Sequence, residues 1–88
     1  MRYEEGVKIK ISEKDDQGIL DVIEYLIVRD NQRFLLVNCF TYESSFSFEM
    51  VSGPEEEFYD LVTKTIEMFL KTSYSNENYI IEAIDLRK

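Results

Sequence analysis

The chain is 88 residues long, enough for a single domain over residues 1–88, and its six phenylalanines and six tyrosines argue against a disordered polypeptide. Its 18 acidic and 10 basic residues give a net charge of −8, which disfavours binding to nucleic acid or to an anionic membrane. Histidine is absent, which argues against histidine-based proton transfer, and the single cysteine argues against a disulfide framework. No apolar run approaches the roughly 18 residues of a membrane span, so a transmembrane helix is not expected.

The first third of the chain predicts strands joined by tight turns. Residues 7–11 alternate apolar and polar side chains, as a half-buried strand does, and residues 14–18 are rich in the residue types of a turn. Residues 19–28 fit two patterns. Their apolar side chains recur at helical spacing, but five of the ten residues are β-branched. Because Asp30 and Asn31 then predict a hairpin, we favour a strand here.

The middle of the chain predicts two further strands. Residues 34–42 carry apolar side chains on both faces of a strand, and the next few residues turn the chain. Residues 46–50 alternate again, so we expect Phe46, Phe48 and Met50 to face inward.

A helix is predicted from about residue 54 to residue 71. Gly53 can cap it, Pro54 suits the first helical position, and Ser52 with Glu55 offers an alternative capping box. The expected apolar stripe consists of Phe58, Leu61, Val62, Ile66 and Phe69. A polar loop over residues 73–78 and a closing strand over residues 79–86 complete the chain.

These elements predict an α+β fold with an antiparallel sheet: a four-strand meander, one helix and a closing strand. If residues 15–29 are helical instead, the order becomes β-α-β-β-α-β, which is ferredoxin-like. In the meander, the central strands are apolar on both faces although only one helix can cover the sheet. Either a partner or a second copy covers the second face, or residues 15–29 form a helix.

No catalytic or metal-binding pattern is present. Cys39 has no base among its sequence neighbours and lies in the predicted strand over residues 34–42, which is typical of a small core residue. The glycines, Gly6, Gly18 and Gly53, form no phosphate loop, and a cluster of histidine or cysteine ligands is missing. We therefore expect neither an enzyme nor a bound cofactor or metal.

The acidic residues are concentrated in one window. Between Phe34 and Thr63 there is no lysine or arginine, while six of the 18 acids fall there. A solvated surface that keeps the protein soluble accounts for this window as well as a binding site does. The binding hypothesis predicts a protein able to occupy a basic groove, with Tyr59 stacking or donating a hydrogen bond at the partner's rim. The predicted partner-binding residues are Glu43, Glu49, Glu55, Glu56, Glu57, Tyr59 and Asp60.

The run from Glu55 to Tyr59 resembles an acidic-aromatic run in small acidic anti-CRISPR proteins, which phages use to inhibit type II CRISPR nucleases. The predicted hairpin over residues 25–37 is also similar in pattern. The resemblance covers about twenty residues, is mostly compositional, and places the run elsewhere in the chain. Proteins of that group mimic DNA and block the basic site that reads the PAM duplex. The resemblance therefore implies an inhibitor that acts in the cytoplasm of a bacterial host on a nuclease or another nucleic-acid-binding protein.

Two alternatives remain open at this point. An immunity protein that neutralises a basic nuclease toxin would carry the same acidic patch. A structural domain that forms a homodimer would need only the two-sided sheet and would have no inhibitory role. Salt distinguishes the inhibitors from the homodimer, because charge-driven association slows steeply as the ionic strength rises.

Overall fold

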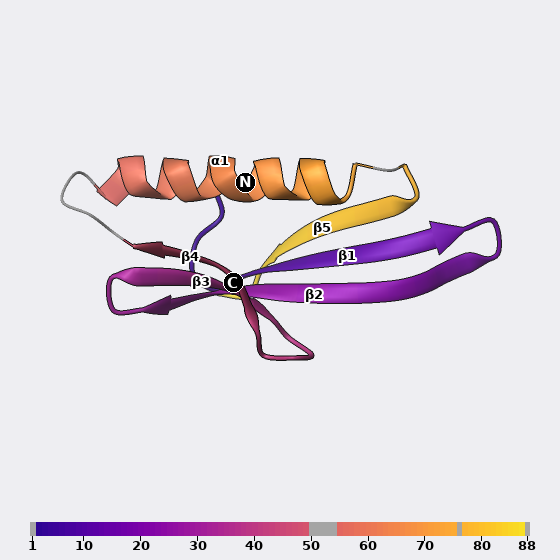
Figure 1. The fold of residues 1–88 in the computed structure, drawn as a ribbon, viewed down its shortest axis with the longest axis horizontal. Coiled ribbons are helices and arrows are strands. Elements are labelled where there is room, and N and C mark those ends of the chain that lie inside the picture. The colour runs from indigo at the N-terminus through magenta and orange to yellow at the C-terminus, as the bar shows by residue number, and fades with distance from the viewer. Residues whose placement is uncertain (1, 50–54, 76, 88) are drawn as a thin grey trace.

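The fold is a five-stranded antiparallel sheet with one long helix on one of its faces (Figure 1). The computed structural model describes residues 2–49, 55–75 and 77–87, and it describes only the backbone of Ser45, Phe46 and Phe48. The elements are β1 (Val7–Asp15), β2 (Gly18–Asp30), β3 (Arg33–Asn38), β4 (Ser44–Glu49), α1 (Glu55–Ser73) and β5 (Tyr79–Asp85). The sheet order is β4-β3-β2-β1-β5, so the predicted α+β fold, with a four-strand meander, a helix and a closing strand, is confirmed.

The ambiguous residues 19–28 lie in β2, the longest strand. Its first part, up to Leu26, pairs with β1, where Ile11 faces Ile23, and its last part, from Tyr25, pairs with β3, where Ile27 faces Leu36. The ferredoxin-like alternative is therefore wrong, because the β-branched residues of this segment pack in a sheet rather than around a helix. The hairpin predicted at Asp30 and Asn31 is confirmed, and Asn31 adopts a φ of 57°, which asparagine tolerates better than most residues.

The strand predicted over residues 34–42 ends early, at Asn38. The side-chain oxygen of Asn38 accepts hydrogen bonds from the backbone N–H groups of Phe40 and Thr41, while its backbone oxygen accepts one from the N–H of Tyr42. Such local hydrogen bonds compete with the ladder of a sheet. Cys39 consequently lies half-buried in the β3–β4 loop, and its predicted place inside a core strand is wrong.

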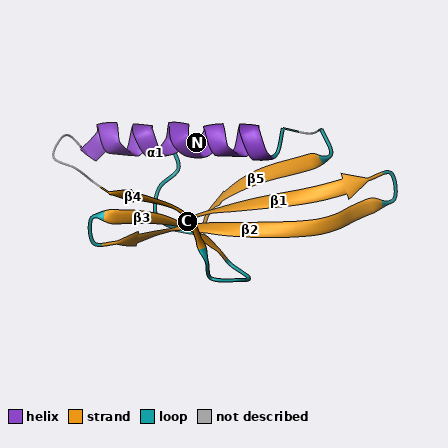
Figure 2. Cartoon of the chain, viewed as in Figure 1, coloured by secondary structure: helices purple, strands orange, loops and turns teal. Residues whose placement is uncertain are grey.

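The core fills the space between α1 and the sheet face that α1 covers (Figure 2). Phe34 is fully buried and lies 5.3 Å from Phe58 and 5.5 Å from Tyr59, measured between ring centroids. The buried apolar residues are Val7, Ile9, Ile11, Tyr25, Ile27, Phe34, Leu36, Phe58, Tyr59, Val62, Ile66 and Leu70. Leu61, predicted to face inward, is 58% exposed, because Tyr59 and Leu70 complete the stripe without it.

The helix start is described from Glu55 onward. The cap residues Ser52, Gly53 and Pro54 and the inward position of Met50 lie outside the described residues. The predicted inward orientation of Phe46 and Phe48 likewise concerns side chains outside the described part of the chain. Within the described residues, no helix is both long enough and apolar enough to cross a bilayer.

Candidate partner-binding surface

The acidic residues from β4 and from the start of α1 lie at one end of the molecule. Glu49 ends β4 opposite Arg33 in the sheet register, and Glu55 is joined to the end of β2 through Arg29. Figure 1 shows the β2–β3 turn, the end of β4 and the start of α1 at this same end. Glu43 is not part of this group, because the β3–β4 loop that carries it projects from the opposite side of the sheet.

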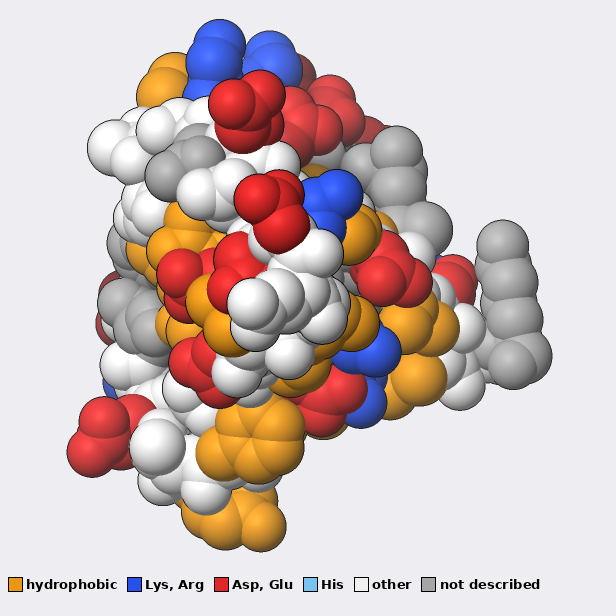
Figure 3. Space-filling view, turned by 90° about the vertical axis from the view of Figure 1, so that its right-hand side faces the viewer, with side chains coloured by type: hydrophobic (Ala, Val, Ile, Leu, Met, Phe, Trp, Pro, Cys, Tyr) orange, Lys and Arg blue, Asp and Glu red, His pale blue; other side chains and the backbone are white. Residues whose placement is uncertain are grey.

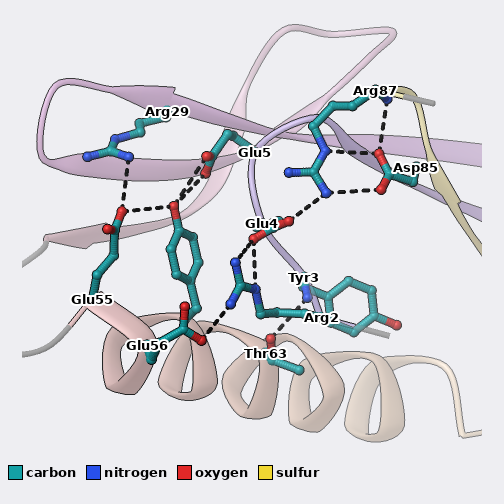
Figure 4. Close-up of polar contacts among 11 residues, drawn as sticks. Arg2, Tyr3, Glu4, Glu5, Arg29, Glu55, Glu56, Thr63, Asp85 and Arg87 are labelled. Atoms are coloured by element: carbon teal, nitrogen blue, oxygen red, sulfur yellow. Dashed lines mark hydrogen bonds and ion pairs between the residues drawn. The ribbon is translucent and has the colours of Figure 1, made fainter.

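Two of the predicted acids are partly neutralised by arginines from outside the acidic window (Figure 4). The guanidinium of Arg29 lies 3.5 Å from a carboxylate oxygen of Glu55, and that of Arg2 lies 2.7 Å from Glu56. Both carboxylates remain more than half exposed, at 56% and 76%, so solvent screens these pairs. The sequence gives no signal for either contact, since each arginine is far from its partner along the chain.

Glu57 and Asp60 differ from Glu55 and Glu56 in having no arginine contact among the described residues. Both are exposed, and within the part of the chain that the structure describes neither carboxylate has an ion-pair partner. Three residues apart on a helix, they lie on the same side of α1. The exposed Leu61 follows Glu57 by four residues and lies beside it, which gives this acidic surface an apolar neighbour. We call Glu57, Asp60 and Leu61 the acidic end. Glu49 lies at the same end of the molecule but on the sheet face opposite α1.

Tyr59 is buried, in contrast to the prediction that it would meet a partner. The residue is 4% exposed, and its hydroxyl donates hydrogen bonds to Glu5 at 3.2 Å and to Glu55 at 3.3 Å. Burial, together with the negative charge of Glu5, raises the pKa of Tyr59 to about 12. The guanidinium of Arg2 lies 4.3 Å from the ring centroid. Tyr59 therefore links the start of α1 to Glu5 and is not available at a partner's rim.

The N-terminal segment fastens α1 to the sheet beside this site. The backbone N–H of Tyr3 donates to the hydroxyl of Thr63 at 3.0 Å, and Glu4 forms ion pairs with Arg2 and Arg87 (Figure 4). Burial alone would raise the pKa of the Glu4 carboxyl, but the hydrogen bonds and charges of the two arginines lower it overall. The segment thus holds the helix start in a fixed position relative to β5 and the sheet.

An open hollow of about 510 Å³ runs along α1, lined by Lys64, Thr65, Met68, Phe69, Thr72 and Ser73. Its lining brings no paired acid and base together. Within the described residues, no group of three His, Cys, Asp or Glu side chains is placed to hold a metal ion. No known protein family, curated protein or solved structure matches the chain.

Proposed function

We propose that this protein is an inhibitor that docks its acidic end on a basic, nucleic-acid-binding surface of a protein partner and keeps nucleic acid away from it. The observation that carries the proposal is the pair of exposed carboxylates, Glu57 and Asp60, on the outer side of a helix that is fixed at its start. A helix that is tied to the sheet suits this task, because less conformational entropy is lost on binding when the surface is pre-organised.

The distribution of charge supports a basic partner rather than a general role in solubility. Glu55, Glu56, Glu57 and Asp60 gather in the first two turns of α1, while the C-terminal half of α1 carries Lys64 and Lys71 beside Glu67. Such an asymmetric field steers association with an oppositely charged surface. Leu61 gives the same surface an apolar contact of the kind that protein interfaces bury at their centre.

The anti-CRISPR resemblance provides the first partner to test, a guide-loaded type II CRISPR nuclease, in the cytoplasm of a bacterial host. The structure alters the basis of that resemblance. In the run from Glu55 to Tyr59, the two aromatic residues are core residues, so the proposed contact rests on the acids and on Leu61. A basic nuclease toxin is the second partner to test, because the same acidic end would suit an immunity protein.

The test compares two double variants of equal charge. Glu57→Lys with Asp60→Lys reverses the acidic end, whereas Asp16→Lys with Glu77→Lys reverses two exposed acids at the opposite end of the molecule. Inhibition of DNA cleavage by each nuclease is measured for wild type and both variants. We expect the first variant to lose about 100-fold or more in inhibitory potency, since like charges facing each other cost several kcal/mol. The second variant should stay within a few-fold of wild type.

Melting temperatures of both variants must accompany these assays. Acids in the first turns of a helix also stabilise it, by about 0.3–1 kcal/mol each, so reversal weakens the fold slightly. If both variants lose equal potency, or if the loss tracks the melting temperature, the acidic end is a solubility feature and the proposal fails. If wild type inhibits neither nuclease, the two nuclease-directed functions are excluded.

A further inference from the structure

The sheet face opposite α1 is not covered by any element among the described residues. Cross-strand register arranges its central side chains in rows. One row joins Val37, Leu26, Lys8 and Ile84, and the row beside it pairs Leu35 with Val28. Ile84 is 39% exposed, and the apolar residues of β2 and β3 on this face are half-buried only by their neighbours in the sheet.

A charged row crosses the centre of this face. Lys10 faces Glu24 on one side and Glu82 on the other, and Lys8 forms an ion pair with Glu24 at 3.0 Å. These two lysines and two glutamates cancel, so the centre of the face is neutral although the whole chain carries −8. Asp30, Arg33 and Glu49 lie at the corner of this face, where β2, β3 and β4 meet. This face does not attract a basic partner as the acidic end does. A second copy of the chain, in contrast, meets no like-charge repulsion at this face.

The dimensions of the face suit a dimer. Strands lie about 4.8 Å apart and rise about 3.3 Å per residue, so five strands of about eight residues cover roughly 600–700 Å². The β3–β4 loop, with Phe40 61% exposed and Tyr42 82% exposed, projects on this side and adds to the area. Figure 3 shows hydrophobic side chains at the lower extremity of the molecule, away from α1. The total approaches the roughly 800 Å² per partner of a standard interface.

We infer that this face is the contact between two copies of the chain, related by a two-fold axis near the charged row. In that arrangement Lys10 of one copy approaches Glu24 or Glu82 of the other, and the apolar rows on either side become buried. An isologous contact of this kind needs a self-complementary patch, which the neutral centre of the face provides. The acidic ends then remain exposed on both copies, so the dimer is compatible with the proposed function and independent of it.

The experiment uses two neighbouring residues of β5 that differ in the face they occupy. Ile80 pairs with Ser12 on the open face, Ile81 pairs with the core residue Ile11 on the face toward α1, and both isoleucines are 38% exposed. Light scattering after size-exclusion chromatography gives the mass of wild type, Ile80→Lys and Ile81→Lys between about 1 and 100 µM. We expect a wild-type dimer that Ile80→Lys weakens at least about tenfold and Ile81→Lys leaves nearly unchanged.

Leu35→Lys provides a second position on the open face, on β3, in case Ile80→Lys does not fold as judged by circular dichroism. It should weaken the dimer in the same way. A wild-type protein that is monomeric up to 100 µM overturns the inference. A dimer that Ile80→Lys and Ile81→Lys weaken equally also overturns it, because that result indicates pairing through the free edge of β5. A dimer that neither Ile80→Lys nor Leu35→Lys weakens contradicts it as well.

Discussion

Replacing Glu4 by glutamine tests whether the N-terminal segment fastens α1 to the sheet. Glu4 is 8% exposed and forms ion pairs with Arg2 and Arg87, whose side chains are 39% and 44% exposed. Breaking a fully buried pair costs about 3–5 kcal/mol, and an exposed pair contributes at most about 1 kcal/mol. Because both arginines can rehydrate and keep Glu56 and Asp85 as partners, we expect Glu4→Gln to cost about 1–3 kcal/mol of unfolding free energy.

In a domain of this size, that cost lowers the melting temperature by about 4–24 °C at pH 7. The effect depends on pH with a defined sign. The pKa of Glu4 is lowered in the folded protein, so its stabilisation is present above the ordinary glutamate pKa of 4.5 and disappears as the pH falls through the lower, folded-state value. Thermal melts from pH 7 to pH 3 should therefore show wild type and variant converging.

The control for Glu4→Gln is Glu77→Gln, which removes one charge from an exposed residue of the α1–β5 loop. It should change the melting temperature by less than about 2 °C, as most surface substitutions do. Equal melting temperatures for wild type and Glu4→Gln at pH 7 would refute the reasoning. A difference that stays constant down to pH 3 would also refute it, because it would show that the carboxylate charge is not the cause.

Two further predictions concern residues near this network. Tyr59→Phe should cost about 1–2 kcal/mol at pH 7, because it removes a donor to two carboxylates. The pKa of Tyr59 is raised to about 12, so the stability that its neutral hydroxyl contributes is present below about pH 10 and is lost between pH 10 and 12. Between pH 9 and pH 11.5, the melting temperature should therefore fall more steeply for wild type than for the variant. Gly6→Ala should cost about 1–2 kcal/mol or more in chemical denaturation, because Gly6 has a φ of 89° and an added Cβ would lie 2.7 Å from Arg87 Cγ. An unchanged denaturation midpoint would contradict that backbone geometry.

Sequence patterns predicted the strands and the helix because local chemistry and packing agree there. In residues 19–28, β-branched side chains outweighed an equally regular helical spacing, because this segment pairs first with β1 and then with β3. The end of β3 was not predictable from hydrophobicity, since residues 34–42 are apolar almost throughout. The side chain of Asn38 ends the strand by satisfying the next backbone N–H groups, and this places Cys39 in a loop.

The candidate site was only partly predictable. Acids adjacent in the sequence, such as Glu56 and Glu57, necessarily lie close together, whereas Glu49 lies at the same end of the molecule but on the sheet face opposite α1. The ion pairs of Arg2 with Glu56 and of Arg29 with Glu55 depend on tertiary structure, and no local sequence pattern predicts them. Conversely, Glu43 belongs to the same acidic window but projects from the other side of the sheet.

The most direct measurement of the proposed function is competition between this protein and DNA for one surface. A fluorescent PAM duplex is bound to the guide-loaded type II CRISPR nuclease, and its anisotropy is followed as the protein is added. We predict full displacement by wild type and by Asp16→Lys with Glu77→Lys, and at least about 100-fold weaker displacement by Glu57→Lys with Asp60→Lys. A nuclease that holds the duplex and this protein at the same time, or equal displacement by both double variants, would contradict the account.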